Sequence, residues 1–429
     1  FMPRRYPLIA AMRYKRSVEG GLVRLWYLVL HGDTGGLVWP YGRPVGKTLM
    51  LDVEGDKVTL TQAGKNLRDV FREGRSGIPC LINHADMETD PIGILSSQAS
   101  IRADWMFEVK RDGTSWINRT SSWEGSHNYA AAGRVGYYKL LEDMGLQYTC
   151  ISSAQLARGD LMTRAIKLFL VPRGMALSNR EIKALRKFTE AGGVLVTDLM
   201  AGRMNENCRV RTGRAAPMDE LMGVKRAPFA FEEDKKAETN SGYKGGFGRW
   251  LDVTMLEGFG TLKAGDTFRI QGFQEPGLAA ASAKPLAKTP TGPAILANKV
   301  GKGTVYTLNF DIPNYLSRRS GKDAAELTAP HRRIFSALLA KAGVEGQLKV
   351  TLKSSGKYPV GLETFRYTQG GYRYLAAIRN KVTRINWQDL SDSGEGVADI
   401  GGSTLLFELP VKGYYITELR TGKSFGMTD

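Results

Sequence analysis

Between residues 91 and 197, short apolar runs alternate with longer amphipathic segments. The apolar runs are short enough to be buried strands, whereas the segments between them repeat apolar residues at helical spacing. Because strands and helices alternate in a segment this short, we predict a parallel, doubly wound α/β sheet with right-handed crossovers. The predicted strands are 91–96, 146–152, 166–171 and 194–197, and the predicted helices are 129–144 and 178–191.

Local signals mark the ends of these two helices. Ser178 begins the sequence SNRE, a capping box in which the Ser178 hydroxyl accepts a hydrogen bond from the amide of Glu181 and the Glu181 carboxylate reaches back. Gly145 and Gly192 follow the two helical patterns, and glycine is the residue that most readily ends a helix.

The segment before residue 91 predicts only a few elements. Residues 17–31 place leucines, Trp26 and Val29 at helical spacing, and a turn then leads into a short strand in GGLVW at 35–39. A second helix is predicted over 60–75, with Thr61 as its N-cap. A helix, a strand and a further helix could be the last pieces of a barrel or of an open α/β sheet.

The remainder of the chain is richer in strands. Residues 250–270 alternate like antiparallel strands, and the Ala/Lys/Pro-rich stretch 277–293 is interpreted as a solvated loop. We expect a hairpin over 293–310 and an amphipathic helix over 331–343. After Val344, short alternating runs separated by glycine and polar turns predict an all-β domain.

Composition places the chain among ordinary globular proteins. It has 429 residues, of which 42% are hydrophobic and 24% charged, and this length favours about three folding units. The formal charge of +17 suggests an anionic partner, but the basic residues are scattered from Arg4 to Lys423 without a basic helix or tail, so we expect no nucleic-acid partner. No apolar run is long enough to span a bilayer, so we expect no membrane partner.

Cysteine and histidine are sparse. Three cysteines and four histidines occur without metal-ligand or disulfide spacing, so we predict no metal site and no disulfide framework. The chain begins with Phe1 rather than methionine, which suggests a processed, truncated or incomplete polypeptide. Nothing in the sequence decides between a cytoplasmic and a secreted protein.

Several longer sequence segments resemble glycoside hydrolase family 42, the β-galactosidase type. They are RLWYLVLHGDTGGLVW at 24–39, LTQAGKNLRDVFREGRSGI at 60–78, PIGILSSQASIRADWM at 91–106 and KLFLVPRGMALSNREIKALRKFTEAGGVLVTD at 167–198. The resemblance implies the end of an incomplete TIM barrel at 1–85, a flavodoxin-like trimerisation domain at 86–345 with a β-rich insertion at 226–310, and a small β-sandwich at 346–429. It also implies a carbohydrate substrate, cleavage with retention, a homotrimer and no cofactor.

The catalytic residues are not identified by this resemblance. A retaining glycosidase needs two carboxyl groups about 5 to 5.5 Å apart, and in the family they lie on earlier barrel strands that nothing here matches. We interpret the carboxylates near the barrel remnant as helix-start or loop residues: Glu19, Asp33, Asp52 and Glu54. The chain by itself is therefore expected to be inactive, and a noncatalytic assembly or carbohydrate-binding protein derived from the family is the alternative.

Substrate-binding candidates lie in two places. Trp39, Tyr41 and Arg43 leave the 35–39 strand, at the end where a complete barrel would hold its sugar, although Trp39 could simply pack at the rim. The resemblance places a loop that bears Arg102, Asp104 and Trp105 near the mouth of an adjoining active site. The alternative for that segment is local packing or an ion pair between Arg102 and Asp104.

Three further features are candidates for a binding or catalytic role. Ser96, Ser97 and Gln98 end the first strand of the predicted sheet, where a flavin or phosphate could bind, but we expect no helix to start directly after them and hence no such site. Cys150 lies within a predicted strand, so we do not expect it to act as a nucleophile. Alternating aromatic residues could form a carbohydrate platform or one face of a sheet: Phe365, Tyr367, Tyr372 and Tyr374.

Overall fold

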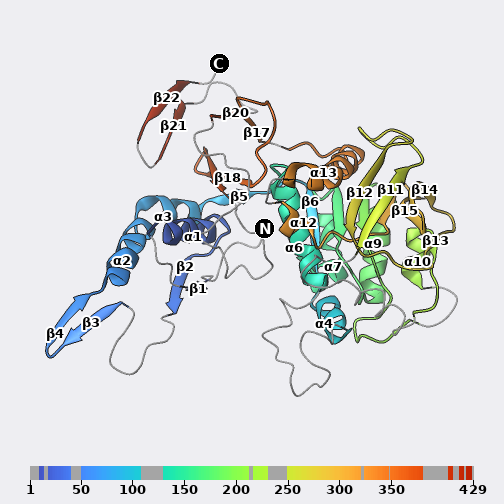
Figure 1. Ribbon diagram of the computed structural model, residues 1–429, viewed down its shortest axis with the longest axis horizontal. Helices are drawn as coiled ribbons and strands as arrows, with labels where there is room; N and C mark the ends of the chain where they lie inside the picture. The colour runs from blue at the N-terminus through green and yellow to red at the C-terminus, as the bar shows by residue number, and fades with distance from the viewer. Residues whose placement is uncertain are drawn as a thin grey trace. The chain divides into compact units, whose positions relative to one another are not determined.

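The computed structural model describes residues 9–13, 18–39, 50–107, 129–211, 216–229, 249–319, 323–346, 348–379, 404–408, 415–419 and 422–427. The chain divides into two compact units (Figure 1). The smaller unit comprises Phe1–Glu88, Leu348–Val382 and Asn386–Asp429, and the larger comprises Thr89–Gln347 and Thr383–Ile385.

The larger unit is built on a nine-stranded sheet whose order is β12-β11-β14-β15-β16-β9-β8-β6-β7. Its parallel part confirms the predicted doubly wound sheet, because β6 pairs in parallel with β7 on one side and β8 on the other, followed by β9 and β16. The parallel strands are β6 (Ile92–Ser96), β7 (Thr149–Ser152), β8 (Leu168–Val171), β9 (Val194–Thr197) and β16 (Gly303–Leu308).

The other strands extend this sheet in an antiparallel direction. They are β11 (Arg249–Met255), β12 (Thr267–Gly272), β14 (Lys284–Thr289) and β15 (Gly292–Val300), and β15 and β16 form the expected hairpin. The prediction of a solvated loop over 277–293 was wrong, because β14 pairs with β11 and β15 and buries Leu286 and Ala287. Pairing on both sides overrides the poor strand propensity of its lysines and proline. The short strands β10 (Val224–Lys225) and β13 (Ala279–Ala280) pair with each other in a separate two-stranded sheet.

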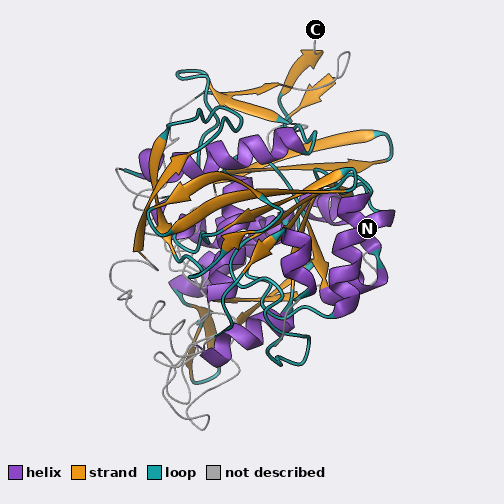
Figure 2. Ribbon diagram, turned by 90° about the vertical axis from the view of Figure 1, so that its right-hand side faces the viewer, coloured by secondary structure: helices purple, strands orange, loops and turns teal. Residues whose placement is uncertain are grey.

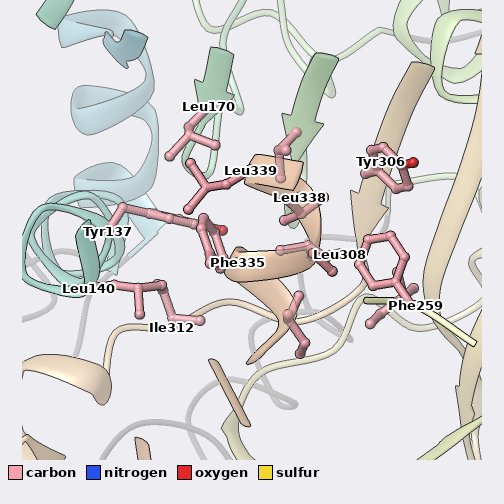
Figure 3. Packing of buried hydrophobic residues seen from close by; sticks show 14 of the residues in the cluster. Tyr137, Leu140, Leu170, Phe259, Tyr306, Leu308, Ile312, Phe335, Leu338 and Leu339 are labelled. Atoms are coloured by element: carbon pink, nitrogen blue, oxygen red, sulfur yellow. The ribbon is translucent and has the colours of Figure 1, made fainter. Parts of the chain in front are cut away.

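Helices cover both faces of the sheet (Figure 2). On one face, Tyr137 and Leu140 pack with Phe335 and Leu338 against Leu170 and its neighbours (Figure 3). Tyr137 and Leu140 belong to α6 (Tyr129–Glu142), and Phe335 and Leu338 belong to α13 (Ala324–Lys341). Helix α12 (Tyr315–Arg318) lies beside them. The opposite face is covered by α7 (Ser153–Arg158), α8 (Asp160–Thr163), α9 (Asn179–Glu190) and α10 (Pro217–Met222). Successive residues of β8 therefore alternate between two cores, as expected for a strand buried on both sides.

The helix ends agree with the sequence signals in most cases. Both hydrogen bonds of the capping box form between Ser178 and Glu181, and Gly145 has a left-handed φ of 74° just beyond α6. Helix α13 was expected to begin at 331 but begins at Ala324, with Pro330 inside it. None of the helices in the described part of the chain is both long and apolar enough to cross a bilayer.

The smaller unit contains a strand that the sequence pattern did not reveal. Strand β1 (Ile9–Arg13) pairs in parallel with β2 (Gly35–Trp39), and α1 (Val18–Leu30) connects them in a β-α-β arrangement. No closed barrel forms among the residues that the structure describes. The hairpin of β3 (Leu51–Glu54) and β4 (Lys57–Leu60) precedes α2 (Gln62–Gly74) and α3 (Gly77–His84), and the Thr61 hydroxyl caps α2 as expected.

The antiparallel strands after Leu348 confirm the predicted β-rich end of the chain. They are β17 (Lys349–Leu352) with β20 (Leu405–Glu408), β21 (Tyr415–Thr417) with β22 (Ser424–Met427), and β18 (Leu362–Gln369) between β19 (Tyr372–Arg379) and β5 (Asp86–Glu88).

The alternating aromatic residues of β18 belong to the core of the smaller unit. Phe365 and Tyr367 are fully buried in one cluster with Leu25 and Val29 of α1, and the Tyr367 hydroxyl donates to the carbonyl of Leu30. These two rings are therefore not a carbohydrate platform, and only Tyr372 of the set is widely exposed. Beside them, His31 at the end of α1 forms a 2.9 Å contact with the buried carboxylate of Glu363.

Two glycines of α6 provide a matched test of how closely this helix packs. A Cβ added at Gly136 would lie 2.4 Å from the carbonyl oxygen of Ile312, whereas one added at Gly133 would meet nothing within 4 Å. Gly136→Ala is expected to lower the free energy of unfolding by about 1–3 kcal/mol. Gly133→Ala is expected to leave it unchanged or raise it by up to about 1 kcal/mol. Urea denaturation measures both, and equal effects would contradict the close approach.

Candidate functional site

The candidate sugar-binding residues fall in different parts of the molecule. Trp39 is the last residue of β2, where its backbone pairs with Arg13. Tyr41 and Arg43 lie outside the described residues. Arg102 and Trp105 lie on helix α4 (Gln98–Phe107) of the larger unit.

The carboxylates near the barrel remnant are also dispersed. Glu19 lies in the first turn of α1, and the amide of Asp33 donates to the carbonyl of Leu28 in the turn that follows that helix. Asp52 and Glu54 are exposed residues of the β3–β4 hairpin. These positions therefore do not identify the facing pair of carboxyl groups that a retaining glycosidase needs.

Helix α4 starts directly after β6, contrary to the expectation from the sequence. The Ser97 hydroxyl accepts from the amide of Ser100, which supplies the local signal for a helix start. The Ser100 hydroxyl donates to the carbonyl of Ala176 at 3.2 Å and accepts from its amide at 3.1 Å. The strand end where doubly wound sheets commonly bind a ligand is therefore occupied by the protein's own chain.

The two sides of α4 have different character. Gln98, Arg102 and Met106 recur at helical spacing and are exposed, and Trp105 beside them is half-buried. Asp104, on the inner side, is 2% exposed. The helix therefore presents a cation and an aromatic ring on the surface while it carries a carboxylate into the interior.

Asp104 joins three segments in the interior. Its Oδ2 accepts from the amides of Tyr129 and Ala130, at 2.6 and 3.0 Å, and thereby caps the start of α6. Its Oδ1 accepts from Nε of Arg173 at 2.7 Å. The sequence offered Arg102 as the partner of this carboxylate, whereas the structure holds it with Arg173, which lies 69 positions further along the chain.

Arg173 is the centre of this buried cluster. It follows β8 with a left-handed φ of 39°, and its side chain is 1% exposed. Its Nη1 contacts Oδ2 of Asp311 at 3.3 Å, and the guanidinium carbon lies 5.4 and 5.9 Å from the ring centres of Tyr129 and Phe273. The planar guanidinium can bind two carboxylates in different directions and also lie against aromatic rings.

Asp198 and Asp311 extend the cluster across the ends of β9 and β16. Asp198 accepts from the amide of Arg173 and, at 3.0 Å, from the hydroxyl of Tyr137, while Asp311 accepts from the amide of Phe273 at 2.9 Å. Burial raises the pKa of Asp311 to about 6, against the opposing effect of Arg173. Burial, together with nearby Asp311, holds the pKa of Asp198 well above its usual range.

Glu275 and its arginines form a second buried cluster, in which the balance of charge is different. Burial opposes the ionisation of Glu275, but the guanidinium groups of Arg226 and Arg203 hold its pKa below the usual value. Its Oε1 accepts from Nε of Arg203 at 2.7 Å and its Oε2 from the amide of Met200 at 2.9 Å. Glu275 therefore holds the loop after β9 through Met200 and Arg203.

The cluster was not predicted from the sequence, and each of its three aspartates is held by Arg173 or by backbone amides. Polar residues directly after apolar runs, such as Arg173 after β8 and Asp198 after β9, were the signal that could have found it. Cys150 lies within β7, as expected, and burial raises the pKa of its thiol. That direction is opposite to the one that activates a cysteine nucleophile. The arrangement is suited to holding segments together, and its burial raises the pKa of Asp198.

Comparison with known proteins confirms the resemblance read from the sequence. A family model described as the beta-galactosidase trimerisation domain matches residues 112–318. This range includes most of the strands of the nine-stranded sheet and most of the helices that cover it. No curated protein matches the chain.

Solved structures of β-galactosidases share the fold. The enzyme from Bacillus circulans sp. alkalophilus is 19% identical, with a TM-score of 0.55 over 84% of this chain and 46% of its own. Gan42B, a GH42 β-galactosidase from G. stearothermophilus, is 13% identical, with a TM-score of 0.60 over 95% and 48%. The β-galactosidase from Rahnella sp. R3 is 16% identical, with a TM-score of 0.54 over 84% and 46%. The chain thus spans about half the length of these structures.

The raised pKa of Asp198 can be tested by substitution. Because the folded state binds a proton on Asp198 more tightly than the unfolded chain, the carboxyl favours folding most at pH values below its ordinary pKa of 3.8. That contribution is lost as the pH rises through the raised pKa. Asp198→Asn keeps a neutral side chain that can still accept from the amide of Arg173, so we expect its stability to equal or exceed that of the wild type at pH 8.

Asp198→Ala is the control, because it leaves the amide of Arg173 and the hydroxyl of Tyr137 without this partner. It is expected to cost about 1–3 kcal/mol for each unsatisfied group. Urea denaturation at pH 5 and pH 8 measures all three proteins. An asparagine variant as unstable as the alanine variant at pH 8 would contradict the raised pKa of Asp198.

Proposed function

We propose that this chain, whose residues 112–318 match the β-galactosidase trimerisation domain, is the C-terminal portion of a β-galactosidase-like glycoside hydrolase. The intact enzyme would cleave β-linked galactosides or related glycosides with retention, and this portion would mainly support and oligomerise it. The trimerisation-domain match carries the proposal, and the fold shared with three β-galactosidases supports it.

The domains of such an enzyme would follow the division expected from the sequence. Residues 1–85 would end a TIM barrel, 86–345 would form the trimerisation domain and 346–429 a small β domain. The parallel pair β1–β2, connected by α1, supports the first assignment because a TIM barrel repeats this unit. Trp39, Tyr41 and Arg43 would then leave a barrel strand at the end that faces the sugar.

Helix α4 would contribute to sugar binding in a neighbouring subunit. Its surface carries the cation of Arg102 and the ring of Trp105, which is half-buried and keeps part of its surface accessible. An aromatic face can stack on a pyranose, and a guanidinium can donate to sugar hydroxyls. The two catalytic carboxyl groups would lie on other strands of the barrel, as the resemblance implies, and a retaining enzyme needs them about 5 to 5.5 Å apart.

The proposal predicts where activity resides. The polypeptide encoded by the uninterrupted reading frame that contains this sequence is expected to hydrolyse a chromogenic β-galactoside. The 429-residue chain is expected to show only background hydrolysis. Robust turnover by the 429-residue chain, abolished by changing one of its own carboxylates, would contradict the assignment. An inactive product of the uninterrupted frame that still binds galactosides would favour a noncatalytic carbohydrate-binding protein.

The oligomerising role can be tested by mass. Three copies of the 47.2 kDa chain have a combined mass of about 142 kDa, which is the value expected by light scattering of the purified chain. Dilution over two orders of magnitude serves as the control for weak association. A particle of a single chain at every concentration would overturn the assembly role.

A further inference from the structure

We propose that Arg173 is a positioning residue that fixes the orientation of helix α4 and, through it, the surface carrying Arg102 and Trp105. The use of that surface in sugar binding rests on the function proposed above. The positioning itself rests only on contacts within the larger unit.

Two anchors hold α4 on its inner side. The first lies near its start, where the hydroxyl of Ser100 both donates to and accepts from the backbone of Ala176. The second lies one helical turn later, where Asp104 binds Arg173 and the amides at the start of α6. Arg173 and Ala176 thus contact the helix at two successive turns, so its rotation and its position along its axis are both determined.

Only the second anchor depends on charge. Arg173 bridges Asp104 on α4 and Asp311 beyond β16, two segments that share no backbone pairing. The backbone amide of Arg173 donates to Asp198, and this hydrogen bond fixes the direction in which the Arg173 side chain leaves its loop. A lysine at this position would offer a single point charge in place of a planar fork and could not reproduce both contacts with the same geometry.

The position of Trp105 depends on this anchor because Asp104 is its neighbour in the helix. Successive residues of an α-helix are about 100° apart, so fixing the direction of Asp104 also fixes the direction in which Trp105 and Arg102 leave the helix. If Asp104 is released, α4 retains the Ser100 anchor and can pivot about its start. Trp105 and Arg102 lie in the part of the helix that such a pivot would displace.

Asp104→Asn separates the two tasks of the carboxylate. The remaining side-chain oxygen can still accept from the amides of Tyr129 and Ala130, whereas the new amide nitrogen cannot accept from Arg173. Hydrogen exchange by mass spectrometry on the 429-residue chain is expected to show about tenfold faster exchange in residues 98–107, with α9 as protected as in the wild type.

The matched control is Asp143→Asn, which disrupts another buried pair of the same unit, between Asp143 and Arg319. It is expected to lower global stability without selectively changing exchange in residues 98–107. Equal exchange in residues 98–107 for the wild type and Asp104→Asn, or the same increase for both variants, would overturn the positioning role. If Asp104→Asn does not fold, Arg173→Lys replaces it under the same criterion.

Activity measurements on the complete enzyme distinguish the positioning of α4 from its use in sugar binding. There, Asp104→Asn is expected to raise KM for the β-galactoside by about tenfold with little change in kcat, as is Trp105→Ala. Faster exchange in residues 98–107 without a change in KM would retain the positioning role but contradict the use of α4 in sugar binding. Unchanged exchange would contradict the positioning role whatever the activity.

Discussion

The side chain of Arg173 brings a positive charge into the interior of the larger unit, and the segments around it depend on the neutralisation of that charge. Asp104 and Asp311 supply the opposite charge from two directions. An isolated charge in such surroundings would carry a desolvation penalty of several kcal/mol, so the three segments must meet in one geometry for the fold to be stable. The ion pairs therefore specify an arrangement more than they add net stability.

This cluster occupies the place where many doubly wound proteins bind a ligand. The carboxyl ends of parallel strands at a switch in strand order form a natural crevice. Here the crevice contains the backbone of Ala176, the hydroxyl of Ser100 and the guanidinium of Arg173. The end of the sheet that binds a ligand in other doubly wound proteins is thus filled by side chains of the domain that matches the beta-galactosidase trimerisation domain.

The charge balance differs between the two buried clusters for a simple reason. Glu275 faces two arginines, so its ionised form is favoured despite burial. Asp198 lies near Asp311 with one arginine between several carboxylates, so its protonated form is favoured. The two pKa shifts therefore have opposite directions, and the difference follows from the number of neighbouring guanidinium groups.

The local sequence was sufficient to determine the parallel strands, the capping box at Ser178, the Thr61 cap and the hairpin of β15 and β16, because each depends on neighbouring residues. It did not reveal β14, since lysine, proline and alanine form a strand there only through pairing on both sides. It did not place Phe365 and Tyr367 in the core, because alternating aromatic residues fit a buried and an exposed sheet face equally well. The partners of Arg173 lie 69 and 138 positions away in the chain, so only the tertiary structure could decide which carboxylates neutralise it.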